Sequence, residues 1–454
     1  MPGAADRPGR SSAMAARVDV VGPGGGGAGA GADDEGRRDV DRRRRSNGMS
    51  GVTRRGLLGM VGATGATLAA TGLSSCASGD RDEAVADGGS GSVIHPFRDV
   101  AHQAGVTAPL TSAATVVALD VRAEDRAELA ETFRTLSDSI EHVMSGEAYV
   151  ERDGGYPAFD TGIVRPGPTS TSVVVGYGAS LFDERFGLAD RKPAELRPMD
   201  HFVNDYLVTD ERSHGDLVLS INADSHEAVV HALRQILRET RGDVIPRWSR
   251  EGFNHLRPDA GPGEAPGRNL LGFLDGTANL DVGDDALMDD VVWIGAGDEP
   301  EWAVGGTYQA IRIIRMMTEF WDRTRLNEQE ELFGRHRASG APLGMEHETD
   351  TPVFDDDALA NHIARANPRL PGTERNLILR RGFNYADGFD ENDQLDQGLI
   401  FTSFQRSLDD GFVTVQRRLD GEALEEYIRP IGGGFYVVGP PPQGDEYLGE
   451  RLLA

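Results

Sequence analysis

Apolar and polar positions between residues 114 and 237 predict strands and helices in a definite order. Three short apolar runs have the length of strands, at residues 114–121, 171–178 and 216–223. After the first run, apolar residues recur at spacings of four and three, which places them on one face of a helix. These residues are Leu129, Phe133, Leu136, Ile140 and Val143.

A second helix is expected to begin at Asp224 or Ser225, because either side chain can cap a helix N-terminus. Its apolar face consists of Val229, Leu233, Ile236 and Leu237. The order strand–helix–strand, followed by strand–helix, is typical of a ferredoxin-like unit.

The pattern recurs more loosely beyond residue 265. Strands are expected over residues 307–317, 399–407 and 432–439, the last preceded by a tight glycine turn. Helices are expected over residues 326–335 and 355–366. The second of these should start at the Asp355–Asp357 cluster and stop at Asn367-Pro368, where proline disfavours further helix. We therefore expect two similar α+β halves, residues 93–265 and 266–454.

The beginning of the chain has a different composition. Residues 1–48 are rich in glycine and arginine and have no apolar periodicity. Such a segment does not bury enough apolar surface to fold, so it is either a disordered extension or lies upstream of a true start at Met49.

A targeting signal is predicted over residues 49–76. Arg54 and Arg55 precede a weakly apolar run, Leu57–Leu73, that is too short and too rich in glycine to span a membrane. Paired arginines before such a run are typical of the twin-arginine export signal. The alternative is a surface helix with a chance arginine pair, although the glycine content would make it a poor helix.

Cys76 is the only cysteine and ends the segment LSSC. This segment resembles the lipobox of exported lipoproteins, in which the cysteine carries a lipid. A lipid on Cys76 would tether the mature protein to the outer face of the membrane through a polar linker, residues 77–92. Cleavage nearby without lipid attachment is the alternative.

The formal net charge of −28 argues against a nucleic-acid partner, because phosphates would be repelled. Lys192 is the only lysine. An acidic surface poor in lysine suits a protein that stays soluble in high salt. A GC-rich coding bias combined with an ordinary acidic surface explains the same composition.

Three residues of the second half are candidates for chemistry. Asp275 lies in the glycine-framed segment GFLDGT, His362 near the last turn of the expected short helix, and Arg380 after an apolar run. Taken singly, each residue also has an ordinary structural explanation. Asp275 would be a turn residue, His362 a packed helix residue and Arg380 a solvated side chain. The chain has no C-x-x-C-H motif, so any haem would be bound non-covalently.

Several segments, in the same order, resemble the dye-decolorizing peroxidase family. They are HQAGV (102–106), GFLDGT (272–277), residues 305–344, NHIARANPR (361–369), LILRRGFNYADG (377–388) and residues 412–440. The resemblance is strongest to the exported, twin-arginine branch associated with iron uptake. Leu280 departs from a frequent proline of the family, at a turn that carries no chemistry.

The resemblance implies two ferredoxin-like halves with antiparallel sheets, peripheral helices and one haem b bound in the second half. His362 would be the axial ligand of the iron. Asp275 would move a proton between the oxygens of peroxide, which favours activity at acid pH. Arg380 would stabilise the charge that develops as the O–O bond breaks and contact a haem propionate.

Further contacts with the cofactor are implied in the same way. The residues expected to lie against the macrocycle are Gly276, Thr277, Ala278, Asn367, Pro368 and Arg369. Arg369 would pair with a propionate. Glu425 is the carboxylate expected to hold the second ring nitrogen of His362.

The leading hypothesis is a peroxidase that reduces hydrogen peroxide while it oxidises dyes, phenolics or ferrous iron. A second hypothesis is a haem-handling protein that releases iron for uptake proteins, and a third is a haem-free binding module. A homo-oligomer is left open. Trp302, Trp321 and Tyr385 could relay electrons, although core packing explains each of them equally well.

Overall fold

The computed structural model describes residues 91–354 and 361–454. The expected extension, the export signal, Cys76 and nearly all of the polar linker lie outside these residues. The expected helix start at Asp355–Asp357 lies outside them as well. None of the described helices is long and apolar enough to cross a membrane.

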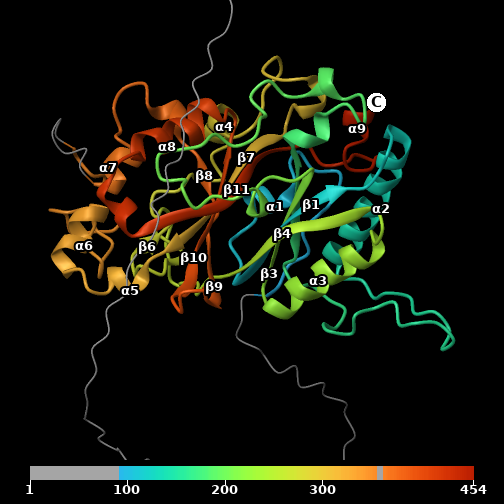
Figure 1. Cartoon of the computed structure of the whole chain (residues 1–454), viewed down its shortest axis with the longest axis horizontal. Coiled ribbons are helices and arrows are strands. Elements are labelled where there is room, and N and C mark those ends of the chain that lie inside the picture. Colours follow the sequence, from blue (N-terminus) through green and yellow to red (C-terminus); the bar gives the residue numbers. More distant parts are fainter. Residues whose placement is uncertain (1–90, 355–360) are drawn as a thin grey trace, which may run out of the picture. The chain divides into compact units, whose positions relative to one another are not determined.

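The first half contains a four-stranded antiparallel sheet that packs against two long helices (Figure 1). Its elements are α1 (Ala104–Thr107), β1 (Ala113–Val121), α2 (Arg126–Ser145), β2 (Ser172–Gly178), β3 (Leu217–Ala223), α3 (His226–Glu239) and β4 (Val244–Phe253). The strand order β2-β3-β1-β4 is ferredoxin-like, and the predicted strands and helices are confirmed. Ser225, and not Asp224, caps α3 by accepting a hydrogen bond from the backbone N of Ala228.

The second half repeats this arrangement in the order β11-β7-β10-β9. Its long strands are β7 (Thr307–Met316), β9 (Phe383–Phe389), β10 (Leu395–Gln405) and β11 (Ile428–Val438). Two-residue strands are β5 (Gly267–Arg268), β6 (Leu274–Asp275) and β8 (Leu379–Arg380). The α-helices are α4 (Asp285–Val291), α5 (Thr318–Trp321), α6 (Leu326–Phe333), α7 (His362–Ala366), α8 (Thr414–Leu419) and α9 (Glu450–Leu453).

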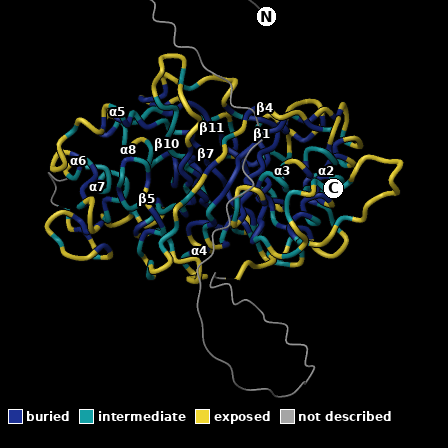
Figure 2. The backbone as a smooth tube through the Cα atoms, turned by 90° about the horizontal axis from the view of Figure 1, so that it is seen from below, coloured by how far each residue is buried: buried dark blue, intermediate teal, exposed yellow. Residues whose placement is uncertain are grey.

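The two sheets join into one closed barrel. Strand β2 pairs with β11, β4 pairs with β9, and β7 pairs with β10. Side chains alternate across the barrel wall: Ala114, Val116 and Ala118 of β1 point into the barrel, whereas Val117 and Leu119 pack toward the helices. Most strand residues are therefore buried, except along β4 and at the end of β9, while other exposed residues lie mainly on the outer loops (Figure 2).

Two local expectations were wrong. His362 is the first residue of α7, capped by Asn361, and does not lie in a last turn. The glycines at 432–434 lie inside β11 and do not form a turn before it. The strand shifts register between Pro430 and Gly432, and a Cβ on Gly432 would lie 2.1 Å from the carbonyl oxygen of Arg212, so only glycine fits there.

Candidate active site

The main cavity lies within the second half. It has a volume of about 260 Å³, and two further cavities in the part of the chain that the structure describes have only about 10 and 20 Å³. Apart from Asn204, all its lining residues fall between Asn269 and Pro430. They come from the segment before β7, from α7 and α8, and from strands β7, β10 and β11.

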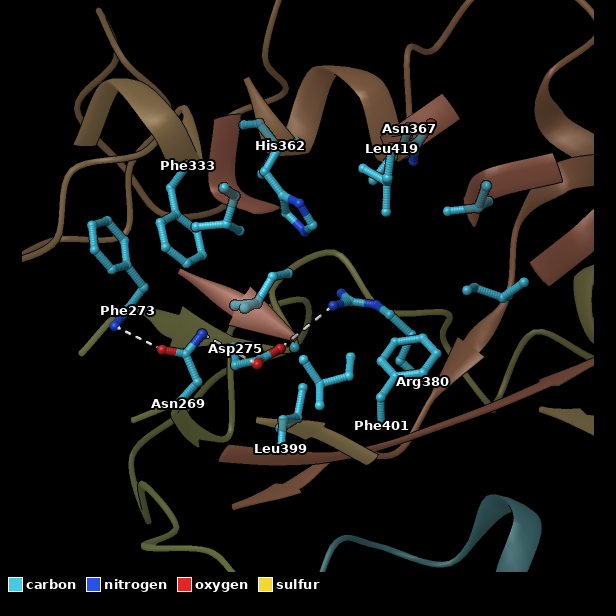
Figure 3. Close-up of a pocket in the computed structure, with 18 of the residues that line it drawn as sticks. Asn269, Phe273, Asp275, Phe333, His362, Asn367, Arg380, Leu399, Phe401 and Leu419 are labelled. Carbon is cyan, nitrogen blue, oxygen red and sulfur yellow. Dashed lines mark hydrogen bonds and ion pairs between the residues drawn. The ribbon is translucent and has the colours of Figure 1, made fainter. Parts of the chain in front are cut away.

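One side of the cavity is formed by His362 and a buried carboxylate. The Nδ1 atom of His362 lies 3.0 and 3.1 Å from the two carboxylate oxygens of Glu422. The Glu422 side chain is 3% exposed, whereas that of His362 is 30% exposed and its ring points into the cavity (Figure 3). Glu422 thus occupies the role expected for Glu425, so that expectation was wrong.

The electrostatic surroundings favour a proton on His362. Burial lowers the pKa of this imidazole, but the charge and hydrogen bond of Glu422 outweigh burial, so the net pKa shift is upward. Asp275 adds to the rise and Arg380 opposes it. With Nδ1 committed to Glu422, the second ring nitrogen is the one available to a ligand in the cavity.

The opposite side of the cavity carries Asp275 and Arg380. A guanidinium nitrogen of Arg380 lies 3.5 Å from a carboxylate oxygen of Asp275. The side-chain amide of Asn269 donates to the other oxygen of Asp275 at 3.4 Å. Backbone N–H groups of Leu271 and Phe273 donate to the side-chain Oδ1 of Asn269, which fixes the direction of that amide. Asp275 is therefore held by one ion pair and one hydrogen bond.

Arg380 is fixed by its backbone as well as by its side chain. Asn279 exchanges two hydrogen bonds with the backbone of Arg380, at 2.8 and 2.9 Å. The guanidinium of Arg380 also donates to the carbonyl oxygen of Thr277 at 3.0 Å. These three hydrogen bonds therefore connect strand β8 to the segment that follows Asp275.

His362 and the Asp275–Arg380 pair face each other across open space (Figure 3). Gly276, Thr277 and Ala278 line the same cavity. Asn367 and Arg369 also line it, whereas Pro368 is buried without being part of the lining. The structure therefore brings together all the sequence-predicted cavity residues except Pro368 and assigns the carboxylate role of Glu425 to Glu422.

Among the lining arginines, Arg335 is a buried one that no sequence motif had indicated. Burial is the main cause that lowers its pKa, and the neighbouring charge of Arg369 lowers it further. Burial alone lowers the pKa of Arg369, which donates to the carbonyl oxygen of Asn367 at 3.0 Å. One buried and one partly buried guanidinium group in the same cavity favour an anionic ligand.

These features fit a haem. Apolar side chains of the lining suit the faces of a macrocycle, and they include Phe273, Leu274, Leu399, Phe401 and Leu419. The imidazole of His362 can ligate iron from one face. The guanidinium of Arg369 has the charge and geometry to bind a propionate. A histidine on one face and an acid with an arginine on the other define a haem-dependent oxidoreductase.

Comparison with known proteins identifies the family. The models for "Dyp-type peroxidase, N-terminal" and "Dyp-type peroxidase, C-terminal" match residues 103–254 and 266–443. Because they cover most of the chain, the protein belongs to the Dyp-type peroxidase family. It is a haem peroxidase, an oxidoreductase that acts on peroxide.

Individual relatives agree with this assignment. The deferrochelatase of Escherichia coli (strain K12) is 45% identical over 363 residues, which are 78% of this chain and 86% of that protein. A DyP-type peroxidase from Cellulomonas bogoriensis is 33% identical with a TM-score of 0.71, over 80% of this chain and 99% of that one. DtpA from Streptomyces lividans is 34% identical with a TM-score of 0.72, over 80% and 98%.

Proposed function

We propose that this peroxidase reduces hydrogen peroxide with Asp275 as the acid–base group and Arg380 as the charge-stabilising group, while His362 holds haem b. The observation that carries this proposal is the position of the Asp275–Arg380 pair, which faces His362 across a single cavity. Dyes, phenolics or ferrous iron would supply the electrons.

The bound haem would supply the iron that receives peroxide and exchanges electrons with it. On the protein side, a carboxylate oxygen of Asp275 accepts the proton of the inner peroxide oxygen and returns it to the outer one. Arg380 stabilises the negative charge that develops as the O–O bond breaks. The amide of Asn269 keeps the Asp275 carboxylate oriented during the transfer.

Replacing Asp275 by Asn keeps the size of the side chain and removes its acid–base capacity. Dye turnover with peroxide is expected to fall about 10²- to 10⁴-fold, while the haem content stays that of the parent protein. The measurement is a stopped-flow rate with peroxide together with steady-state turnover. A variant that reacts at the parent rate would rule out this role for Asp275.

A second candidate is release of iron from haem, because the deferrochelatase relative is 45% identical. This activity would serve iron-uptake proteins. Two incubations separate the functions: the protein with haem and a reductant, and the haem-loaded protein with hydrogen peroxide and a dye. Intact protoporphyrin free of iron supports release, whereas oxidised dye with unchanged haem supports the peroxidase function alone.

We further propose export by the twin-arginine route and a lipid on Cys76, which place the protein on the outer face of the membrane. The motifs around Arg54, Arg55 and Cys76 support this proposal. Changing both arginines to lysine should keep the protein in the cytoplasm, and Cys76→Ser should release it from membranes. Fractionation of cells that express each variant tests both parts, and an unchanged distribution contradicts them.

A further inference from the structure

A buried glutamate outside the cavity lining accepts four hydrogen bonds, three of them through its carboxylate. Glu348 is 7% exposed. One carboxylate oxygen accepts hydrogen bonds from the hydroxyl of Thr277 at 2.8 Å and from the backbone N of Ala265 at 2.5 Å. The other accepts from the guanidinium of Arg257 at 2.9 Å, and the backbone carbonyl oxygen accepts from Arg335 at 2.9 Å.

These contacts lie directly behind the segment that carries the acid. Thr277 is two residues beyond Asp275, and the backbone N of Ala278 donates to the carbonyl oxygen of Gly263 at 3.0 Å. A Cβ on Gly276 would lie 2.7 Å from Pro266. Residues 275–278 are therefore packed between the cavity on one side and residues 263–266 on the other.

The backbone of this segment needs such support. Gly276 has a φ of 104° and Ala278 a φ of 55°. A positive φ at a residue with a side chain is energetically unfavourable and persists only where the surroundings enforce it. Glu348 is the buried group that joins Thr277 to residue 265, so it is placed to enforce this conformation.

Glu348 also balances charge near the cavity. Arg257, which it binds, has a second carboxylate partner in Glu264 at 3.4 Å. Burial and Arg369 lower the pKa of Arg335, while Glu348 acts in the opposite direction. Removal of this carboxylate would leave less negative charge to offset the positive charge of the cavity arginines.

We propose that Glu348 is a positioning residue for proton transfer at Asp275: it holds residues 275–278 so that the carboxylate of Asp275 faces His362 across the cavity. This inference rests on the proposed role of Asp275. Glu348 itself does not line the cavity, so it acts only through residues 275–278. A displacement of about 1 Å at a reacting group can lower a rate about 100-fold, so loss of this support should be visible in kinetics.

The test compares Glu348→Ala, Glu348→Gln and the matched control Glu264→Gln in the haem-loaded full chain. The control removes the other carboxylate on Arg257 without touching Thr277. Glu348→Ala should slow the reaction with peroxide about 10- to 100-fold, with an unchanged KM for the dye. Glu348→Gln keeps an oxygen that can accept from Thr277, so it should retain most of the rate, and Glu264→Gln should behave as the parent.

Two further readouts separate positioning from general stability. Hydrogen–deuterium exchange of the peptide around residues 274–279 should rise in Glu348→Ala and not in Glu264→Gln. In an Asp275→Asn background, Glu348→Ala should cause no further loss of rate, because both changes act on one step. The proposal is overturned if Glu348→Ala lowers the rate as much in the Asp275→Asn background as in the parent protein. It is also overturned if hydrogen–deuterium exchange around residues 274–279 does not rise. If Asp275→Asn alone leaves the rate unchanged, the proposed function fails instead, and the exchange result still reports on Glu348.

Discussion

The contact between Glu422 and His362 can be tested by replacing one carboxylate oxygen with an amide nitrogen. Both carboxylate oxygens lie within 3.1 Å of Nδ1, and the Glu422 side chain is 3% exposed. A hydrogen bond to a charged group contributes about 1.5–3 kcal/mol, and about 1.4 kcal/mol corresponds to a factor of ten. Glu422→Gln keeps a neutral acceptor, so haem should dissociate about 10-fold faster. Glu422→Ala removes the acceptor, and the factor should approach about 100.

The assay follows the transfer of haem from the loaded protein to an excess of a haem-free globin. A second measurement is the reduction potential of the iron, which should rise because a less basic imidazole stabilises ferric iron less. Glu425→Gln is the matched control in the same short segment, and it should lose haem at nearly the parent rate. Faster loss in Glu425→Gln than in Glu422→Gln would refute the assignment of Glu422.

Two other outcomes are expected. Arg369→Gln should weaken haem binding about 10-fold, because the guanidinium is partly buried and suited to a propionate. Titration with haem and with its dimethyl ester checks this, and an equal loss for both contradicts it. Burial raises the pKa of Glu425, so its folded form favours the proton and stability falls as the pH rises through that pKa. Glu425→Gln should therefore raise the Tm at pH about 8 and give no gain below pH about 4, and a gain that does not depend on pH contradicts this reasoning.

The strands were predictable from the sequence because apolar runs such as 114–121 must be buried on both faces of the barrel wall. For the helix that carries His362, the sequence correctly predicted only the C-terminal end, at residue 366. Asp355–Asp357 and Asn361 are both plausible caps by residue type, and the hydrogen bond from Ala364 N identifies Asn361 as the cap of the described helix. The cap signal directly before the histidine was therefore present but ambiguous.

The sequence alone could not show whether Glu422 or Glu425 contacts the ring of His362. Both carboxylates belong to the same short segment, GEALEEY. The turn over Ala423–Glu426 directs Glu422 to a histidine 60 residues away and leaves a carboxylate oxygen of Glu425 buried without a hydrogen-bond partner. Such a contact depends on how distant segments pack, which local residue patterns do not encode.

The pairing of β2 with β11 and of β4 with β9 bears on any attempt to shorten this protein. A fragment from residue 266 onward would keep every lining residue of the cavity except Asn204. It would nevertheless present β9 and β11 as unpaired borders, whose free N–H and C=O groups invite association with other chains. The amino-terminal half contributes almost nothing to the pocket. It is nevertheless needed, because its strands cover the edges of the half that forms the pocket.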